Sequence, residues 1–261
     1  MIPKVIHYCW FGGKKIPKML KKCMKSWKKY CPDYQIIEWN EKNFNINEMP
    51  QYVRDAYEAK KWAFVTDYAR LWIVYHYGGI YLDTDVELIK PLDALLCYNG
   101  FFGFENHDYK TINTGLGFGA EKGLKIVADL MMPYDTQKFV YPDPNKGEFV
   151  PNTWINWPVF EAHGVIKTDV VQIIDHKVAV FPGEYFDPMI GYLREEICIT
   201  KNTYSIHHYS MTWDDNHEKK VRHEKIQNNI VLPMKRFWRK ALGNKLYDNI
   251  KKMAGRNIDD I

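Results

Sequence analysis

One stretch limits the fold of this 261-residue chain more than any other. Apolar residues recur at helical spacing over 62–77, and a glycine pair then ends the helix. Ile80–Leu82 reads as a short apolar strand that runs directly into Asp83 and Asp85. A helix, a glycine break, a buried strand and an acidic turn in this order favour an α/β fold, in which ligands bind beyond the carboxyl ends of strands.

The rest of the chain continues this alternation and contains no internal repeat. Residues 133–151 hold four prolines in a polar setting and read as a long loop of the kind that often closes over a site. Apolar runs and helical spacing predict strands over Lys4–Trp10, Tyr34–Trp39, Phe101–Phe104, Asn113–Gly119, Val170–Ile174, Val178–Phe181 and Thr203–Tyr209, and helices over Pro17–Tyr30, 50–59, Leu124–Met131 and 152–163, the last broken by Pro158.

The acidic turn is a candidate metal site. Asp83 and Asp85 are one residue apart at the end of a strand, so both carboxylates can turn toward one hard cation. Mg²⁺ and Mn²⁺ take oxygen ligands and share them with substrate phosphates. An Asp-x-Asp pair alone is common in surface turns, so its context has to decide. Asp67 and Arg70 supply that context, because a spacing of three places them on one face of the preceding helix.

Several stretches together resemble glycosyltransferase family 32, the Asp-x-Asp sugar-binding enzymes that are related to the catalytic domains of large glucosylating toxins. The resemblance implies a GT-A type nucleotide-diphospho-sugar transferase fold over 1–230, with a mainly parallel central sheet flanked by helices, and leaves a helical tail over 231–261. The stretches that carry it are 2–13, Ser26-Trp27, 32–40, 65–85, 180–188 and 206–213.

The same resemblance implies roles for the acidic residues. Asp85 would bind the metal directly, and Asp83 would contact the donor ribose or sugar and see the metal at longer range. Asp67 would accept hydrogen bonds from hydroxyls of the donor sugar. Arg70 would hold sugar or phosphate oxygens, to which its planar fork can donate two hydrogen bonds.

Other residues are candidates for binding the donor. Trp10 is at the end of the first predicted strand and offers a face for stacking the nucleotide base. Tyr81 lies beside the acidic turn and is expected to reach the diphosphate or ribose, unless it is part of the core. By resemblance, Asn113 lies near the donor sugar, and Thr212 with Trp213 lies at the diphosphate.

Two consecutive histidines compete for the place of a third metal ligand. His207 and His208 point to opposite faces of the predicted strand, so only one of them is expected to reach the site. The family pattern favours His207. The alternative, a structural role, stays open for either one.

The function that these residues predict is a metal-dependent hexosyltransferase. It would use Mn²⁺ or Mg²⁺ to transfer sugar from a nucleotide-diphosphate sugar to a saccharide or lipid-linked acceptor. The family resemblance implies retention of configuration, and it implies a role in bacterial surface polysaccharide synthesis such as that of capsule. Two alternatives stay open. Asp83 and Asp85 also imitate the nucleophile and acid/base of haloacid-dehalogenase phosphatases, and a non-catalytic carbohydrate-binding protein would also use many aromatic residues.

Composition bears on location and partners. Five cysteines without a C-x-x-C pair favour reduced thiols, and neither a signal peptide nor a long uncharged apolar segment is apparent, so we expect a cytoplasmic protein. The formal net charge is +4, with lysines concentrated in 14–29 and basic residues recurring over 235–256. No nucleic-acid motif accompanies them. The tail at 231–261 reads as a basic amphipathic helix for the inner face of an anionic plasma membrane, or for packing on the domain.

Overall fold

The computed structural model describes residues 1–106, 110–140, 150–190 and 196–210. Met1–Ser210 forms one compact unit. Thr212, Trp213 and the tail at 231–261 lie outside the described residues, so the domain boundary at 230 and the amphipathic helix stay predictions.

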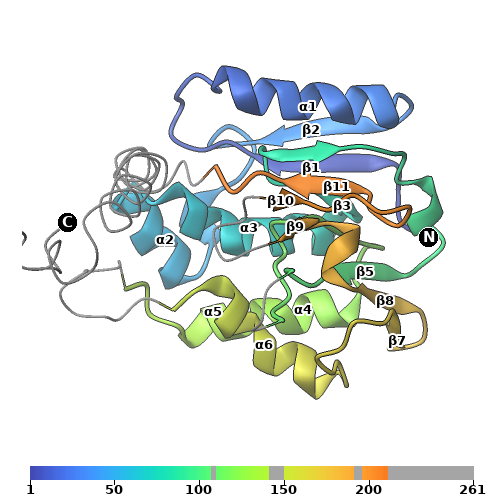
Figure 1. Ribbon diagram of the computed structural model, residues 1–261. Coiled ribbons are helices and arrows are strands. Elements are labelled where there is room, and N and C mark those ends of the chain that lie inside the picture. The colour runs from blue at the N-terminus through green and yellow to red at the C-terminus, as the bar shows by residue number, and fades with distance from the viewer. Residues whose placement is uncertain (107–109, 141–149, 191–195, 211–261) are drawn as a thin grey trace, which may run out of the picture. The chain divides into compact units, whose positions relative to one another are not determined.

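A central sheet of seven strands organises this unit (Figure 1). Two short ribbons, each of two antiparallel strands, lie outside this sheet. In spatial order the central strands are β2 (Gln35–Trp39), β1 (Val5–Cys9), β3 (Gly79–Tyr81), β6 (Phe118–Ala120), β5 (Gly100–Gly103), β8 (Val178–Phe181) and β7 (Gln172–Ile174). The ribbons are β4 (Val86–Leu88) with β11 (Ser205–His207), and β9 (Met189–Ile190) with β10 (Glu196–Ile197).

The central sheet is mixed but mainly parallel. β1 pairs parallel with both β2 and β3, and β5 pairs parallel with β8. β6 runs antiparallel between β3 and β5, and β7 runs antiparallel to β8 at the edge. The other five strands therefore share one direction. The carboxyl ends of β1 and β3 lie side by side, and we refer to this end of the strands as the carboxyl edge of the sheet. The predicted α/β class with a mainly parallel sheet is confirmed.

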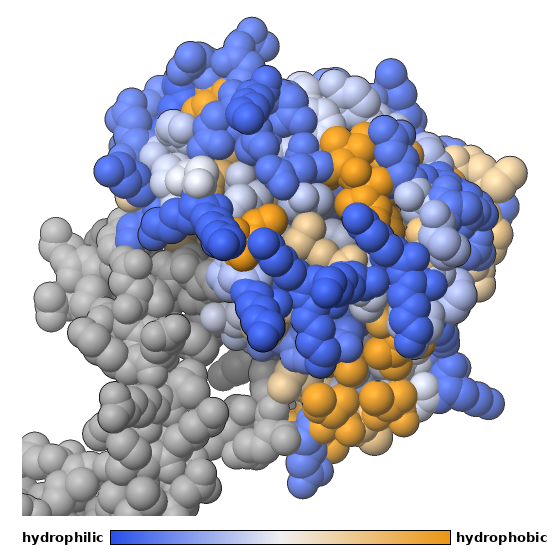
Figure 2. Space-filling model, turned by 90° about the horizontal axis from the view of Figure 1, so that it is seen from above, coloured by the Kyte–Doolittle hydropathy of each residue, from blue (hydrophilic) through white to orange (hydrophobic). Residues whose placement is uncertain are grey.

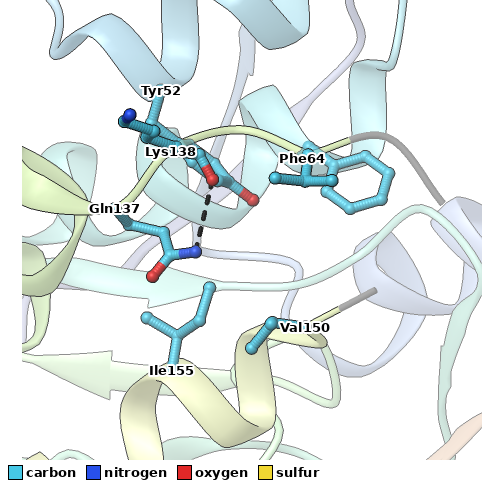
Figure 3. Close-up of a pocket in the computed structure, with 7 residues that line it drawn as sticks. Tyr52, Phe64, Gln137, Lys138, Val150 and Ile155 are labelled. Carbon is cyan, nitrogen blue, oxygen red and sulfur yellow. Dashed lines mark hydrogen bonds between the residues drawn. The ribbon is translucent and has the colours of Figure 1, made fainter. Parts of the chain in front are cut away.

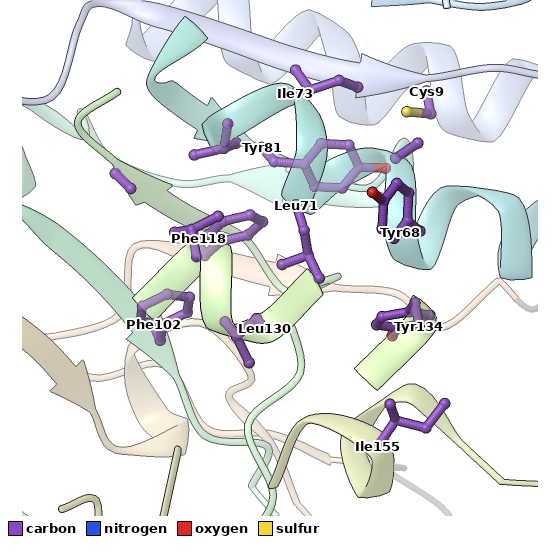
Figure 4. Packing of buried hydrophobic residues seen from close by; sticks show 14 of the residues in the cluster. Cys9, Tyr68, Leu71, Ile73, Tyr81, Phe102, Phe118, Leu130, Tyr134 and Ile155 are labelled. Carbon is purple, nitrogen blue, oxygen red and sulfur yellow. The ribbon is translucent and has the colours of Figure 1, made fainter. Parts of the chain in front are cut away.

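Helices cover both faces of this sheet. Along β1, β3, β5 and β8, successive side chains alternate between two buried clusters, as the two-residue period of a strand requires. One cluster packs against α2, α3, α4, α5 and α6, and Figure 4 shows part of it, with Tyr81, Phe102 and Phe118 beside Leu71 and Leu130. The other packs against α1. The helices are α1 (Lys18–Tyr30), α2 (Gln51–Glu58), α3 (Trp62–Tyr77), α4 (Lys125–Met131), α5 (Pro133–Thr136) and α6 (Asn152–Ala162).

The structure corrects the prediction for the strand at Asn113–Gly119. Only Phe118–Ala120 is a strand, and the residues before it form a turn. Gly117 has φ +117°, a backbone conformation that a continuous strand does not contain, and the side chain of Asn113 accepts a hydrogen bond from the Gly115 N–H within the turn. The turn brings this segment back toward the acidic residues after β3.

Two further differences concern the helices. Pro158 lies inside α6 without ending it. The loop expected at 133–151 begins with the short helix α5, and residues 141–149 lie outside the described part of the chain, so its role as a lid stays a prediction. Among the described residues, no helix is both long and apolar enough to cross a bilayer.

Candidate active site

The acidic turn and His207 meet at one point. Asp83 and Asp85 follow β3, while His207 ends β11, which pairs with β4 directly after the turn. The Nε2 of His207 lies 3.2 Å from Asp85 Oδ1 and 3.9 Å from Asp83 Oδ2. One ligand atom from each of the three residues lies within 4.8 Å of the others. The β4–β11 ribbon therefore carries a residue from the end of the described chain to the acidic turn.

Asp85 is held in a fixed orientation. Its Oδ2 accepts hydrogen bonds from the N–H and the hydroxyl of Ser210, each at 2.8 Å, which leaves Oδ1 facing His207. Burial disfavours the carboxylate, but His207 and the two Ser210 bonds outweigh burial and lower the pKa of Asp85. Burial also opposes the charged imidazole, yet Asp85 and Asp83 raise the pKa of His207. The cluster therefore contains an ionised carboxylate with one oxygen directed at the imidazole.

The side chains of His207 and His208 point in different directions, as expected for consecutive residues of a strand. His208 points away from the cluster, and its Nε2 lies 2.9 Å from Glu87 Oε2. His207 is buried and presents Nε2 to both aspartates, while its Nδ1 has no hydrogen-bond partner among the described residues. Of the two, His207 is therefore placed to serve as a ligand, and its metal-binding role stays a prediction.

The Asp67–Arg70 pair joins the acidic turn from α3. The Nη2 of Arg70 lies 3.2 Å from Asp67 Oδ1 and 3.4 Å from Asp83 Oδ1. The guanidinium also donates to the carbonyl of Thr66 at 3.1 Å and to the hydroxyl of Thr114 at 3.4 Å. Arg70 is almost completely buried, and the neighbouring carboxylates overcome burial and raise its pKa. A fixed positive charge therefore lies between Asp67 and the acidic turn.

Asp67 has a different electrostatic situation. Burial raises the pKa of this carboxyl to about 7, although Arg70 and the amide of Asn152 favour its ionised form. The amide of Asn152 donates to Oδ1 at 2.7 Å, the same oxygen that faces Arg70. Asn152 begins α6, so the far helix helps to orient Asp67. The sequence did not single out Asn152, because nothing local marks an asparagine at a helix start as a partner for α3.

Tyr81 and Trp10 occupy different environments. Tyr81 is buried, donates its hydroxyl to Asp83 Oδ1 at 2.9 Å, and has the Arg70 guanidinium 5.2 Å from its ring centre. It is therefore part of the core and a partner of the acidic turn at once. Trp10 is half-buried after β1, and its indole N–H donates to the Lys14 carbonyl at 2.5 Å. Because β1 and β3 end at the same sheet edge, Trp10 lies at the edge that carries the acidic turn.

Asn113 is held by a group that the sequence did not reveal. Its amide donates to Glu105 Oε1 at 2.8 Å, and the hydroxyl of Thr111 donates to Glu105 Oε2 at 2.9 Å. The phenol of Tyr209 donates to Asp187 at 2.9 Å and packs edge-on to the His207 ring. The Tyr209 hydroxyl also lies 3.3 Å from Glu105 Oε1, so this buried network connects the Asn113 turn with the segment that follows His207.

Gly115 allows the turn to approach the acidic residues. A Cβ at this position would collide with Asp83 Oδ2 and would lie 3.0 Å from Arg70 Nη1 and 3.0 Å from Asn113 Oδ1. The Asp83 N–H also donates to the Gly115 carbonyl at 3.3 Å. The glycine-rich run at 115–119 was visible in the sequence, but the reason for its first glycine is visible only in three dimensions.

A small pocket lies away from this cluster (Figure 3). It contains none of the acidic residues, and the Gln137 amide donates to the Lys138 carbonyl inside it. The pocket is too small to hold a nucleotide sugar, so the chemical cluster rather than this pocket marks the candidate site. Its lining residues are Tyr52, Phe64, Gln137, Lys138, Val140, Val150 and Ile155.

The residues at the cluster fit a divalent cation. Two carboxylates and one imidazole are donors that Mn²⁺ and Mg²⁺ accept, and imidazole suits Mn²⁺ better than Mg²⁺. Asp83, Asp85 and His207 would hold the ion. The phosphatase alternative requires a lysine at the acidic turn. Among the described residues, no lysine contacts Asp83 or Asp85; the cation at Asp83 is Arg70.

Comparison with known protein families also finds a match. Residues 17–102 match the family described as glycosyltransferase sugar-binding region containing DXD motif. Over these residues the chain is similar to DXD glycosyltransferases. The matched part contains Asp67, Arg70, Asp83 and Asp85, whereas His207 lies beyond it. The family match supports the glycosyltransferase class that the sequence predicted.

Two curated relatives are yeast enzymes. The chain is 35% identical over 105 residues to inositol phosphoceramide mannosyltransferase 1 of Schizosaccharomyces pombe, which covers 36% of this chain and 31% of that protein. It is 32% identical over 105 residues to mannosyl phosphorylinositol ceramide synthase SUR1 of Saccharomyces cerevisiae, covering 39% of this chain and 27% of that protein. The chain thus spans less than a third of the length of either relative.

Two solved structures with limited likeness to the chain are titled as glycosyltransferases. The PaToxG glycosyltransferase is 18% identical with a TM-score of 0.39, covering 50% of this chain and 59% of that chain. A glycosyltransferase involved in the glycosylation of the major capsid of PBCV-1 is 13% identical with a TM-score of 0.47, covering 84% of this chain and 100% of that chain.

Proposed function

We propose that this protein is a metal-dependent glycosyltransferase of the GT-A type that takes its sugar from a nucleotide-diphosphate donor. One observation carries the proposal: Asp83, Asp85 and His207 converge at the sheet edge where the buried Asp67–Arg70 pair also arrives. The family match covers the acidic turn and the pair together. Neither a structural ion pair nor a simple carbohydrate-binding surface requires this combination of groups.

Each residue has a task that follows from its position. A bound Mn²⁺ or Mg²⁺ would supply Lewis-acid neutralisation of the charge that develops on the leaving diphosphate. Arg70 is buried and fixed by Thr66 and Thr114, so its guanidinium stabilises negative charge without having to reorganise. Asp67 orients hydroxyls of the donor sugar, and Trp10 offers a stacking face to the base at the same edge of the sheet.

The acceptor is proposed to be a saccharide or a lipid-linked saccharide. The names of the curated relatives describe mannosyl transfer to inositol phosphoceramide, which is a lipid. A lipid-borne acceptor would place the enzyme at a membrane surface. On the family resemblance of the sequence, we further propose a role in bacterial surface polysaccharide synthesis at the inner face of the plasma membrane, with retention of configuration at the transferred sugar.

The test is hydrolysis or transfer with a panel of nucleotide sugars, with Mn²⁺, with Mg²⁺ and with EDTA. Asp85→Asn removes a ligand charge with little change in size and should lower turnover of the active donor by at least about a hundredfold. Asp169→Asn is a matched control, since Asp169 is exposed and pairs only with Lys110 among the described residues. Turnover of every donor below detection, or full activity of Asp85→Asn in Mn²⁺, would refute the proposal.

A phosphatase assay separates the remaining alternative. An aryl phosphate should not be hydrolysed by the protein in Mg²⁺, because Asp83 is hydrogen-bonded to Tyr81 and faces Arg70 rather than a lysine. Turnover of the aryl phosphate that disappears in Asp83→Asn would favour the phosphatase alternative instead.

A further inference from the structure

The exposed face of α1 and the segment before it carry a concentration of positive charge. Eight lysines lie in residues 14–29, all of them exposed, and no acidic residue precedes Asp33. The buried face of the same helix consists of Leu20, Cys23, Ser26 and Trp27. Figure 2, which views the molecule from the side of α1, shows hydrophilic side chains across this surface, interrupted by separate hydrophobic patches.

Ion pairs within the described part of the chain do not account for this concentration of charge, although Lys28 and Lys29 lie in the last turn of α1, where the helix dipole favours cations, and Lys29 lies over the Tyr30 ring. None of the eight lysines forms an ion pair with a described residue, whereas Lys4, Lys110 and Lys125 elsewhere do. Lys18 begins the helix, where the helix dipole disfavours a cation, and no acidic residue lies in the first turn. Lys21 and Lys22 lie three and four residues after Lys18, and four and three residues before Lys25, which are spacings at which like charges repel. Such a face is explained by an external anionic partner.

Apolar side chains among the lysines indicate what kind of partner this is. Met19 is 43% exposed, and Ile16 and Met24 are half-buried at the border of the charged face. Lysines that surround accessible aliphatic side chains on a helix are typical of interfacial binding, in which the charges meet lipid headgroups and the apolar groups enter the boundary below them. A purely polar polyanion would make no use of the exposed Met19.

We propose that the lysine face of α1 docks the protein on an anionic lipid bilayer. The face lies next to the candidate site, because the indole of Trp10 donates to the carbonyl of Lys14 just before α1 begins. Docking through α1 would bring this edge of the sheet close to the lipid surface. The lipid binding itself does not depend on the proposed transferase activity; only its use for reaching a lipid-linked acceptor rests on it.

The experiment measures vesicle binding of the full chain. The vesicles contain phosphatidylcholine either alone or mixed with phosphatidylglycerol, at low and high salt. Wild-type protein should bind the mixed vesicles, and salt should weaken the binding. The variant Lys18→Gln, Lys21→Gln, Lys25→Gln and Lys28→Gln should lower the partition coefficient at least about tenfold. Glutamine matches lysine in helix propensity, so the melting temperature should not fall.

A matched control removes the same number of charges elsewhere. Lys42, Lys60, Lys122 and Lys177 are exposed and lie outside α1, and their joint change to glutamine should leave the partition coefficient within about twofold. Equal losses in both variants would show that binding follows net charge alone and would overturn the proposal. So would equal binding to both kinds of vesicle, or binding to heparin without binding to vesicles. Donor hydrolysis without vesicles should be unchanged in the α1 variant, which separates failure of docking from failure of the proposed chemistry.

Discussion

Asp67 is a residue at which burial and charge act in opposite directions. Its carboxyl lies beside Arg70, yet burial raises its pKa to about 7 from an ordinary value of 3.8. The folded state thus holds this proton more tightly than the unfolded state does. The stability that results is fully present below about pH 4 and is lost as pH rises through 7. Ionisation of Asp67 at neutral pH consequently lowers the stability of the folded protein.

This predicts a pH-dependent effect of Asp67→Asn. The amide stays neutral, so without metal the variant should lose less free energy of unfolding than the wild type between pH 5 and pH 8, by roughly 1–3 kcal/mol. Urea unfolding at several pH values measures this difference. Asp169→Asn, on the surface, should keep the wild-type slope. If the free energy of unfolding of wild type and of Asp67→Asn changed with pH in parallel, the Asp67 carboxyl would have the same pKa in the folded and unfolded states, which would contradict the prediction.

Gly115 leads to a prediction that rests on the lack of room for a side chain at this position. A methyl group at this position would overlap Asp83 Oδ2 and crowd Arg70, so Gly115→Ala should displace the acidic turn. We expect donor turnover to fall at least about tenfold, since small misplacements of catalytic groups are costly. Gly123→Ala is the comparison, because nothing lies within 4 Å of a Cβ there, although its φ of +76° adds strain. Near-normal kinetics in Gly115→Ala, with both variants folded, would contradict the tight fit.

Some of these residues could be predicted from the sequence and others could not. Asp67, Arg70, Asp83 and Asp85 occur close together along the chain, so spacing and resemblance suffice to predict that they lie near one another, as Asp67, Arg70 and Asp83 do. The partners that orient them, such as Asn152, come from distant segments. No local pattern distinguishes an asparagine that starts a helix from one that also bonds a carboxylate across the fold.

Among the elements, β4 was not predicted from the sequence, although the strand that pairs with it was. β4 has only three residues and follows the acidic turn at once, so its apolar pattern is too short to mark a strand. It forms because β11 supplies its partner from far along the chain. The same limit explains the error at residues 113–117, where apolar and glycine residues resemble a strand until the φ of Gly117 is known. The long helices and the buried strands were predictable because their periodic patterns extend over many residues.

The attachment of α1 to this ribbon yields a prediction about stability. The indole of Trp27 donates to the Val86 carbonyl at 2.7 Å, and the indole is fully buried. Trp27→Phe leaves that carbonyl without its donor, so the free energy of unfolding should fall by about 2–4 kcal/mol, including the lost volume. Trp154→Phe is the matched control, since Trp154 is 62% exposed and its change should be nearly neutral. Chemical denaturation of both variants measures the effect, and equal stabilities would mean that α1 is not anchored through Trp27.

At the scale of the whole molecule, segments from the whole described chain end at one edge of the sheet. Trp10 comes from the first strand, the acidic turn from the third, and His207 from the last. A nucleoside diphosphate with Mn²⁺ would join these segments, and a ligand that binds only the native state stabilises it by a free energy that grows with the logarithm of its concentration relative to Kd. At a ligand concentration of about a hundred times Kd, the stabilisation should be roughly 2.7 kcal/mol, or a few degrees in Tm.

This predicts a thermal shift that needs both the nucleotide and the metal. Nucleoside diphosphate plus Mn²⁺ should raise Tm, and EDTA should remove most of the shift because the diphosphate loses the ion held by Asp83, Asp85 and His207. Trp10→Ala should reduce the shift by weakening base stacking, worth about 1–3 kcal/mol per base. Trp154→Ala, an exposed tryptophan on α6, should keep the full shift. An equal shift in Trp10→Ala would eliminate the stacking role, and a shift that EDTA leaves intact would place the nucleotide away from the acidic turn.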